Sequence, residues 1–183
     1  MNDQNPWTLL SSSVKYENKW MTVHEDQVLT PEGDEGIYGY VESKDSVMIV
    51  VLNPENEFYL IRTFSYPTKS WSWELPGGGG EGEDALLASQ RELIEETGIS
   101  ANTWHKLGST RVCNGLMTER LTTYLATDIS FGERPASDDT GLIESGHFFT
   151  MDQIHQMIED GEIDDGQSLT GLYLAERWLA SRS

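Results

Sequence analysis

Residues 77–99 read GGGGEGEDALLASQRELIEETGI, and this stretch is the strongest evidence for the fold. Three carboxylates, those of Glu92, Glu95 and Glu96, share one side of a predicted helix. At about 100° of rotation per residue, Glu96 stands about 40° and Glu95 about 60° from Glu92. The apolar residues occupy the opposite arc and are expected to pack against a sheet: Leu86, Leu87, Leu93 and Ile94.

The flanks of this helix carry start and stop signals. We expect the helix to run from about Asp84 to Thr97, with Gly98 as its C-terminal cap. Before it, Pro76 and the glycines 77–80 are predicted to form a loop, because such a run suits neither a strand interior nor a helix interior. A glycine loop can bring its backbone close to a ligand or metal, so one of its carbonyls is a further candidate metal ligand.

The acidic face has a physical cost that a bound cation removes. Like charges three or four positions apart on a helix repel by a few tenths of a kcal/mol per pair. Hard cations such as Mg²⁺ and Mn²⁺ prefer carboxylate, carbonyl and water oxygens, and Mg²⁺ is commonly shared between carboxylates and substrate phosphates. The helix therefore predicts a divalent-metal site.

The spacing of the whole stretch resembles the Nudix box. Five residues separate Gly77 from Glu83, and seven more separate Glu83 from Arg91-Glu92-Leu93; Glu95-Glu96 and Gly98-Ile99 complete the pattern. The resemblance implies a hydrolase of nucleoside diphosphates linked to another moiety, dependent on Mg²⁺ or Mn²⁺.

Roles follow from the same resemblance, residue by residue. Glu92 and Glu96 match the principal metal ligands, and Glu95 matches a further ligand or water-mediated contact. Arg91 resembles the arginine that orients these carboxylates, and Glu83 the outer acid of the box. The loop is one residue shorter than is usual after Leu-Pro-Gly-Gly, so the box glycine is Gly77 by count and Gly78 by local motif. Both are candidates for the metal-binding carbonyl.

Length and composition exclude several classes of protein. The 183 residues, 37% of them hydrophobic, suffice for one ordinary domain or for a domain with an N-terminal extension. No run approaches the roughly 18 apolar residues of a membrane span, and the first segment does not resemble a signal peptide, so a cytoplasmic location is expected. The net charge of −19 argues against binding nucleic acid through its phosphates. The single cysteine, Cys113, is interpreted as a small apolar filler.

The remaining chain predicts strands before the box and a mixture after it. The near-continuous apolar run Ser46–Leu52 indicates a buried central strand. Other strands are expected at Lys19–Leu29, Ile37–Val41, Glu57–Phe64, Trp71–Leu75, Trp104–Arg111 and Arg120–Thr127, and around Phe148–Phe149. An acidic loop is expected at 129–141, and helices at Met151–Glu159 and Leu169–Ala180. This order predicts an α/β/α sandwich around a mixed sheet, which is the Nudix fold.

Motifs outside the box resemble the ADP-ribose and nucleotide-sugar pyrophosphatase branch of that family. They are Asn18-Lys19-Trp20, Thr30-Pro31-Glu32-Gly33, Arg62-Thr63-Phe64-Ser65-Tyr66-Pro67, Trp73-Glu74-Leu75-Pro76-Gly77 and Glu159-Asp160-Gly161-Glu162-Ile163. The branch implies that an N-terminal strand region, residues 1–43, joins two copies into a homodimer, and that residues 44–183 form the hydrolase domain. It also implies cleavage of ADP-ribose or a related sugar into a nucleoside monophosphate and a sugar phosphate.

The sequence identifies substrate-binding residues less specifically than it identifies the metal site. Trp20 and Tyr38 match positions that stack on the base in some members, and a packing role suits each equally well. Ser65 stands where the branch often has a diphosphate-binding arginine, which Arg62 could replace; a solvent-facing role suits Arg62 equally well.

The resemblance does not identify the residue that acts as general base, because the chain also departs from the branch at that position. Gly141 stands where the branch often has a glutamate base. Glu119 and Glu144 are the favoured substitutes, with Asp138 and Asp139 as neighbours, against the alternative that these acids are simply solvated.

The predicted chemistry is attack of water on one phosphorus of a diphosphate, with bound metal polarising phosphorus and an acidic side chain removing the proton. The alternative substrates are GDP-mannose, NADH and a diadenosine polyphosphate. A different class is a Nudix-fold nucleotide sensor without catalysis. Such a protein usually needs a partner-binding extension, often basic, and tends to have a damaged box, whereas this box is intact and the chain is acidic.

Overall fold

The structure is a computed structural model that describes residues 5–80, 82–133 and 143–182. The chain divides into two compact units. The first comprises residues 1–44 and 111–120, and contains a three-stranded antiparallel sheet in the order β1-β2-β3. Its strands are β1 (Thr8–Glu17), β2 (Met21–Leu29) and β3 (Glu35–Ser43). Segment 111–120 is joined to β3 by hydrogen bonds such as that from the Val41 amide to the Leu116 carbonyl, 2.8 Å.

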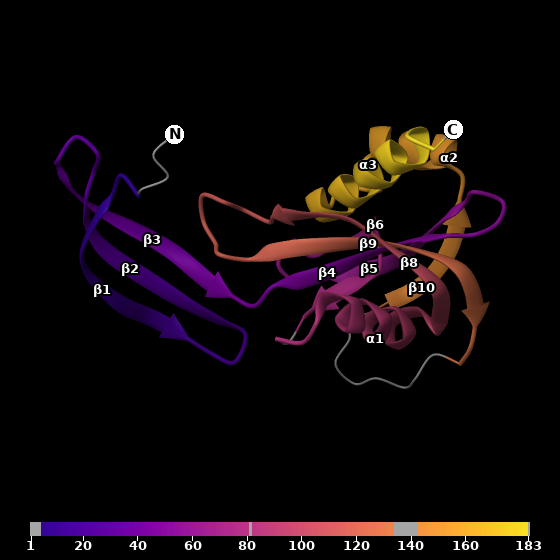
Figure 1. Ribbon diagram of the computed structural model, residues 1–183, viewed down its shortest axis with the longest axis horizontal. Coiled ribbons are helices and arrows are strands. Elements are labelled where there is room, and N and C mark those ends of the chain that lie inside the picture. The colour runs from indigo at the N-terminus through magenta and orange to yellow at the C-terminus, as the bar shows by residue number, and fades with distance from the viewer. Residues whose placement is uncertain (1–4, 81, 134–142, 183) are drawn as a thin grey trace. The chain divides into compact units, whose positions relative to one another are not determined.

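The second unit is a mixed sheet with helices on both faces. Strands β4 (Ser46–Leu52), β5 (Phe58–Ser65), β8 (Ile99–Arg111), β9 (Arg120–Phe131) and β10 (Ile143–Phe149) run in the order β10-β5-β4-β9-β8. β4 is parallel to β9 and antiparallel to β5. Helix α1 (Ala85–Thr97) covers one face, and α2 (Met151–Glu159) and α3 (Gly166–Ala180) cover the other (Figure 1). The central strand is buried from Val47 to Leu52, as expected for a strand covered on both sides.

The segment before α1 changes partner along its length. Strand β6 (Ser70–Glu74) pairs with β5, whereas β7 (Gly77–Gly79) pairs with β4, where β4 and β5 have separated. The prediction that glycines 77–80 form no strand was wrong for 77–79. These glycines have low strand propensity, but the open edge of β4 supplies hydrogen-bond partners that override it.

Helix α1 has the predicted ends. The Asp84 carboxylate accepts hydrogen bonds from the Leu86 and Leu87 amides, and Gly98 ends the helix with φ 72°. The predicted apolar arc was only partly correct. Leu93 is buried with Ala88 against Val47, Ile49 and Val51 of β4.

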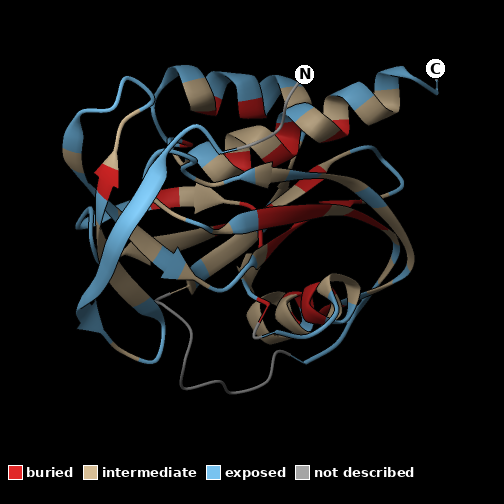
Figure 2. Cartoon of the chain, turned by 60° about the vertical axis from the view of Figure 1, so that its left-hand side comes forward, coloured by how far each residue is buried: buried red, intermediate tan, exposed pale blue. Residues whose placement is uncertain are grey.

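Leu87 and Ile94, which lie about 20° apart at the other end of that arc, are 57% and 40% exposed. Figure 2 shows the buried residues concentrated in the central strands and on the sheet-facing sides of the helices.

Strand β1 was not predicted. Its ten residues are all exposed, and its polar centre, Ser11-Ser12-Ser13, lacks the alternation of a half-buried strand. Pairing with β2 defines it instead, from Thr8 opposite Leu29 to Glu17 opposite Thr22. Cys113 is exposed, so its interpretation as a small apolar filler was wrong. None of the described helices has the length and apolar character needed to span a membrane.

Candidate active site

Arg91 is the centre of the acidic cluster on α1. Its Nε and Nη2 donate to Glu83 Oε1 at 3.0 and 2.8 Å, and Nη1 donates to Glu92 Oε1 and Glu95 Oε2, both at 2.9 Å. Nη2 also donates to the Gly79 carbonyl at 3.0 Å. The planar guanidinium thus joins three carboxylates to the glycine segment, a geometry that lysine cannot reproduce.

The electrostatics of this cluster keep Arg91 charged. Partial burial lowers the pKa of its guanidinium, but the hydrogen bond to Glu83, the charge of Glu92 and the hydrogen bonds to Glu92 and Glu95 outweigh burial, and the net pKa is raised. One cation is therefore fixed among several acids, and the local potential stays strongly negative. Such a potential attracts a metal cation and repels a phosphate that arrives without one.

The glycines of β7 are required by close approaches. A Cβ on Gly77 would lie 2.5 Å from the Val47 carbonyl oxygen, so a side chain there would break the pairing with β4. A Cβ on Gly78 would lie 2.5 Å from the Glu92 carboxylate. The Gly77 amide donates to Glu96 Oε2 at 2.8 Å. The two candidate box glycines therefore differ in what they do: the Gly77 amide binds the Glu96 carboxylate, and Gly78 leaves room for the Glu92 carboxylate.

The donor set suits a hard cation. Glu92, Glu95 and Glu96 offer only carboxylate oxygens, and Gly78 leaves a space beside Glu92 that any side chain would fill. Among the described residues, no three acidic, histidine or cysteine side chains converge as a ready-made cage. Bound to Arg91 and to the Gly77 amide, these carboxylates are held on one side of the helix, where they could hold a divalent cation.

Arg62 and Glu144 form an ion pair on the other face of the sheet. Tyr59 packs into the core on the α1 side, and strand alternation points Arg62, three residues further along β5, to the opposite side. Glu144 lies at a register shift in β10, between Ile143 and Ser145, and accepts a hydrogen bond from Arg62. The structure therefore does not bring these two predicted residues to the α1 cluster.

Three further predicted residues belong to the first unit. Trp20 is largely exposed, with the Lys19 ammonium 4.3 Å from its ring centroid. The Tyr38 hydroxyl donates to the Gly115 carbonyl at 3.2 Å, and Glu119 Oε2 accepts from Ser43 Oγ at 3.4 Å. Asp138, Asp139 and Gly141 lie outside the described residues.

Comparison with known families explains the cluster and the division of the chain. The NUDIX domain family matches residues 42–170. The chain belongs to the Nudix family. A second family, described as nucleoside diphosphate sugar hydrolase N-terminal domain, matches residues 7–41 and so covers most of the β1-β2-β3 sheet of this Nudix protein.

Several individual proteins resemble this Nudix chain along most of its length. An ADP-ribose pyrophosphatase of Mycobacterium tuberculosis is 25% identical over 171 residues, which are 92% of this chain and 83% of the relative. A methanol dehydrogenase activator of Bacillus methanolicus is 27% identical over 145 residues, 79% of this chain and 78% of the relative. The crystal structure of an ADP compounds hydrolase superimposes with a TM-score of 0.84 at 21% identity, covering 97% of this chain and 96% of that one.

These findings confirm the predicted fold, a Nudix α/β/α sandwich around a mixed sheet, and the predicted class of enzyme, a Nudix pyrophosphohydrolase. The sequence reasoning missed Trp71, whose ring centroid lies 5.4 Å from Arg62 Cζ. The register of the β5–β6 hairpin, with Phe64 opposite Trp71, could have indicated this contact.

Proposed function

We propose that this Nudix protein hydrolyses the diphosphate of a nucleoside diphosphate sugar, with ADP-ribose as the first candidate. The products are a nucleoside monophosphate and a sugar phosphate. Mg²⁺ or Mn²⁺ is the proposed cofactor, at the α1 face formed by Glu92, Glu95 and Glu96 with a carbonyl of Gly77 or Gly78. A methanol dehydrogenase activator among the relatives shows that the fold serves other purposes, so the substrate has to be tested.

The observation that carries this proposal is the intact cluster around Arg91. Three of its carboxylates bind one guanidinium, and the glycine segment touches both Glu92 and Glu96. The sugar part of the proposal has separate support from the N-terminal family match at residues 7–41. The choice of ADP-ribose rests on the named activities of two relatives, from M. tuberculosis and Bacillus subtilis.

The reaction requires one bond to form and one to break. The oxygen of a water molecule attacks one phosphorus, the bond from that phosphorus to the bridging oxygen breaks, and the leaving phosphate keeps its electron pair. An acidic side chain takes the proton of the water. A divalent cation, when bound, neutralises phosphate charge and makes a bound water more acidic. Arg91 orients Glu92 and Glu95, and the Gly77 amide holds Glu96, so the carboxylates are positioned before substrate arrives.

Glu119 is the better of the two proposed general bases. The contact of Glu144 with Arg62, on the sheet face opposite α1, argues against a direct role for Glu144. We expect Glu119→Gln to lower kcat by at least a hundredfold with metal affinity unchanged, since general bases commonly contribute 10²–10⁴-fold. Glu144→Gln is the matched control and should keep kcat within a few fold. The reverse pattern would transfer the role to Glu144.

A substrate panel tests the proposed function as a whole. Purified protein is incubated with ADP-ribose, other nucleoside diphosphate sugars, GDP-mannose, NADH and diadenosine polyphosphates, with Mg²⁺ or Mn²⁺ and with chelator. Release of nucleoside monophosphate from ADP-ribose, absent with chelator, is the expected result. Faster turnover of another substrate would replace ADP-ribose, and no release from any substrate would favour the sensor.

A homodimer is proposed from the exposed apolar surface of the first sheet. Six large hydrophobic residues of its strands and of the β1–β2 turn are more than half exposed, although a small sheet needs a covered apolar face to be stable: Leu9, Leu10, Val14, Tyr16, Trp20 and Ile37. We propose a second copy of this chain as the partner.

Sedimentation of the purified protein tests this. Ile37→Lys, at a position 65% exposed, should shift the chain to monomer, whereas Tyr173→Lys on α3, 61% exposed, should not. A monomeric wild type would refute the dimer.

A further inference from the structure

Ser168 on α3 is a buried polar residue that the Nudix box does not include. Its exposure is 0%, and both its amide and its hydroxyl oxygen take part in hydrogen bonds. The amide donates to the helix-capping carboxylate of Asp165 at 2.7 Å, and Oγ accepts from the Leu75 amide at 2.9 Å. This residue therefore joins the first turn of α3 to the strand segment that leads into the glycines.

The segment that Ser168 holds lies between two ladders. Pairing of β6 with β5 ends at Glu74, and pairing of β7 with β4 begins at Gly77, so Leu75 lies at the change of partner. The Leu75 side chain also packs closely against α3, where a Cβ on Gly171 would lie 2.6 Å from Leu75 Cδ1. A buried amide at this point depends on the Ser168 hydroxyl, because bulk water cannot reach it as a substitute.

The contacts continue from Leu75 to the candidate metal ligands. The Pro76 carbonyl accepts from the Ile49 amide at 2.8 Å, and the next residue, Gly77, donates its amide to Glu96 Oε2 at 2.8 Å. Only Pro76 therefore lies between the residue whose amide is held by Ser168 and the residue whose amide holds Glu96. A shift at Leu75 displaces Gly77, because the intervening proline has little backbone freedom.

We propose that Ser168 is a positioning residue of the active site, which sets the Leu75–Gly77 segment and through it the carboxylate of Glu96. The inference rests on the proposed function for its effect on catalysis, but its structural part is independent of the substrate. Helix α3 then has a task besides covering the sheet: its first turn fixes the backbone from which Glu96 is held.

The test compares Ser168→Ala with Thr123→Val. Thr123 is also 0% exposed and lies beside Gly171, but its hydroxyl has no hydrogen-bond partner among the described residues. Ser168→Ala should lower kcat about tenfold or more with KM changed less than twofold, as expected for a small misplacement of a working group. Thr123→Val should leave both unchanged.

A second measurement needs no substrate and no metal. The Gly77 amide, hydrogen-bonded to a carboxylate, is followed by NMR chemical shift and by hydrogen exchange. In Ser168→Ala its resonance should move and its exchange should accelerate at least tenfold, while Thr123→Val leaves both as in wild type. If the Gly77 amide resonance shifts in Ser168→Ala but the wild-type protein turns over no substrate, the proposed function fails and the positioning role of Ser168 stands.

Two results would overturn the proposal. One is a Ser168→Ala protein with an unchanged Gly77 amide; the other is an equal change in Thr123→Val, which would indicate general loosening of the core. If Ser168→Ala does not fold, Ser168→Cys takes its place, since a thiol fills similar space and accepts hydrogen bonds weakly. It should give the same changes in smaller measure, and an unchanged Gly77 amide in that variant would equally refute the role.

Discussion

Gly78→Ala separates stability from catalysis in this site. The added methyl carbon would lie 2.5 Å from Cδ and Oε2 of Glu92 and 2.6 Å from Oε1. Ordinary contact needs about 3.5 Å, so the carboxylate must retreat by about 1 Å. The end of a glutamate side chain can move that far by rotation, at a cost of about 0.5–1.5 kcal/mol if it leaves its preferred rotamer.

The consequence for catalysis is larger, because the group that moves is the proposed metal ligand. A misplacement of about 1 Å can cost about a hundredfold in rate, equivalent to about 2.7 kcal/mol of barrier. We expect kcat with saturating Mg²⁺ to fall by about that factor, while thermal unfolding shifts by only a few degrees. Initial rates and calorimetry measure the two effects on the same preparation.

Gly79→Ala is the matched control, since a Cβ at Gly79 would meet no atom within 4 Å. It adds the same methyl group to the neighbouring residue of the same strand, and it should keep kcat within a few fold. Wild-type turnover in Gly78→Ala, or an equal loss in Gly79→Ala, would refute the reasoning that the Gly78 backbone makes room for Glu92.

Three further changes have distinct signatures. Gly77→Ala places a Cβ 2.5 Å from the Val47 carbonyl, a backbone atom that cannot rotate away, so the free energy of unfolding in urea should fall by about 1–3 kcal/mol; an unchanged midpoint would contradict this. Glu96→Gln should leave unfolding near wild type and abolish metal-dependent turnover, and retained activity would remove Glu96 from the site. Burial raises the pKa of Glu74 above its ordinary 4.5, and the charges of Asp165 and Asp164 add to this, against a hydrogen bond from Ser72. The folded chain therefore holds this proton more tightly than the unfolded chain, and stability should fall as pH rises from 4.5 through the folded pKa. Glu74→Gln should flatten that fall in urea titrations between pH 4 and 8, and identical pH profiles would exclude Glu74 as its source.

Sequence patterns correctly predicted the elements that depend on interactions between residues close in sequence. The ends of α1 follow from the Asp84 cap and from Gly98, and β4 follows from its unbroken apolar run. Pairing between strands could not be predicted from the sequence in the same way. Strand β1 owes its form to β2, and β7 forms because β4 has a free edge beside three glycines that would otherwise favour a loop.

The same division holds for the site. The box spacing predicted Arg91, Glu92 and Glu96 as neighbours, because residues a turn apart on one helix stay together in any fold. The position of Arg62 depended on which face of β5 it occupies, and that follows from packing of Tyr59 against the α1 core. Ser168 is 93 residues from Leu75 in sequence, so only the fold could reveal their hydrogen bond.

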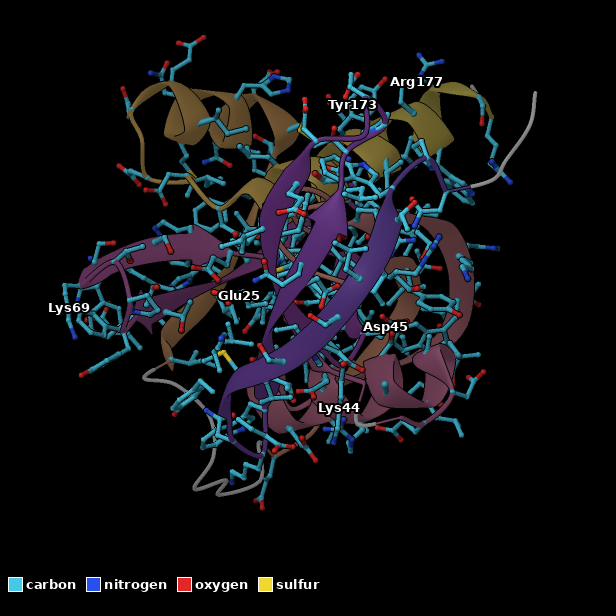
Figure 3. All side chains as sticks on the ribbon, turned by 90° about the vertical axis from the view of Figure 1, so that its left-hand side faces the viewer. Glu25, Lys44, Asp45, Lys69, Tyr173 and Arg177 are labelled. Carbon is cyan, nitrogen blue, oxygen red and sulfur yellow. The ribbon has the colours of Figure 1, made fainter. Side chains whose placement is uncertain are left out.

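The change of partner between β6 and β7 has a consequence for how such a chain can vary. Beyond Ser65 and Ser70 the β5–β6 hairpin pairs with nothing else in the described ladders, and Lys69 stands at its tip (Figure 3). Residues added or removed at that tip leave both ladders in register, because the fork at Leu75–Pro76 is fixed separately by Ser168 and Ile49. The hairpin is therefore a place where an insertion, a label or a new recognition loop can be accommodated without disturbing the glycines of β7. A single residue inserted between Leu75 and Gly77 would instead reverse the faces of β7, with Gly78 no longer beside Glu92.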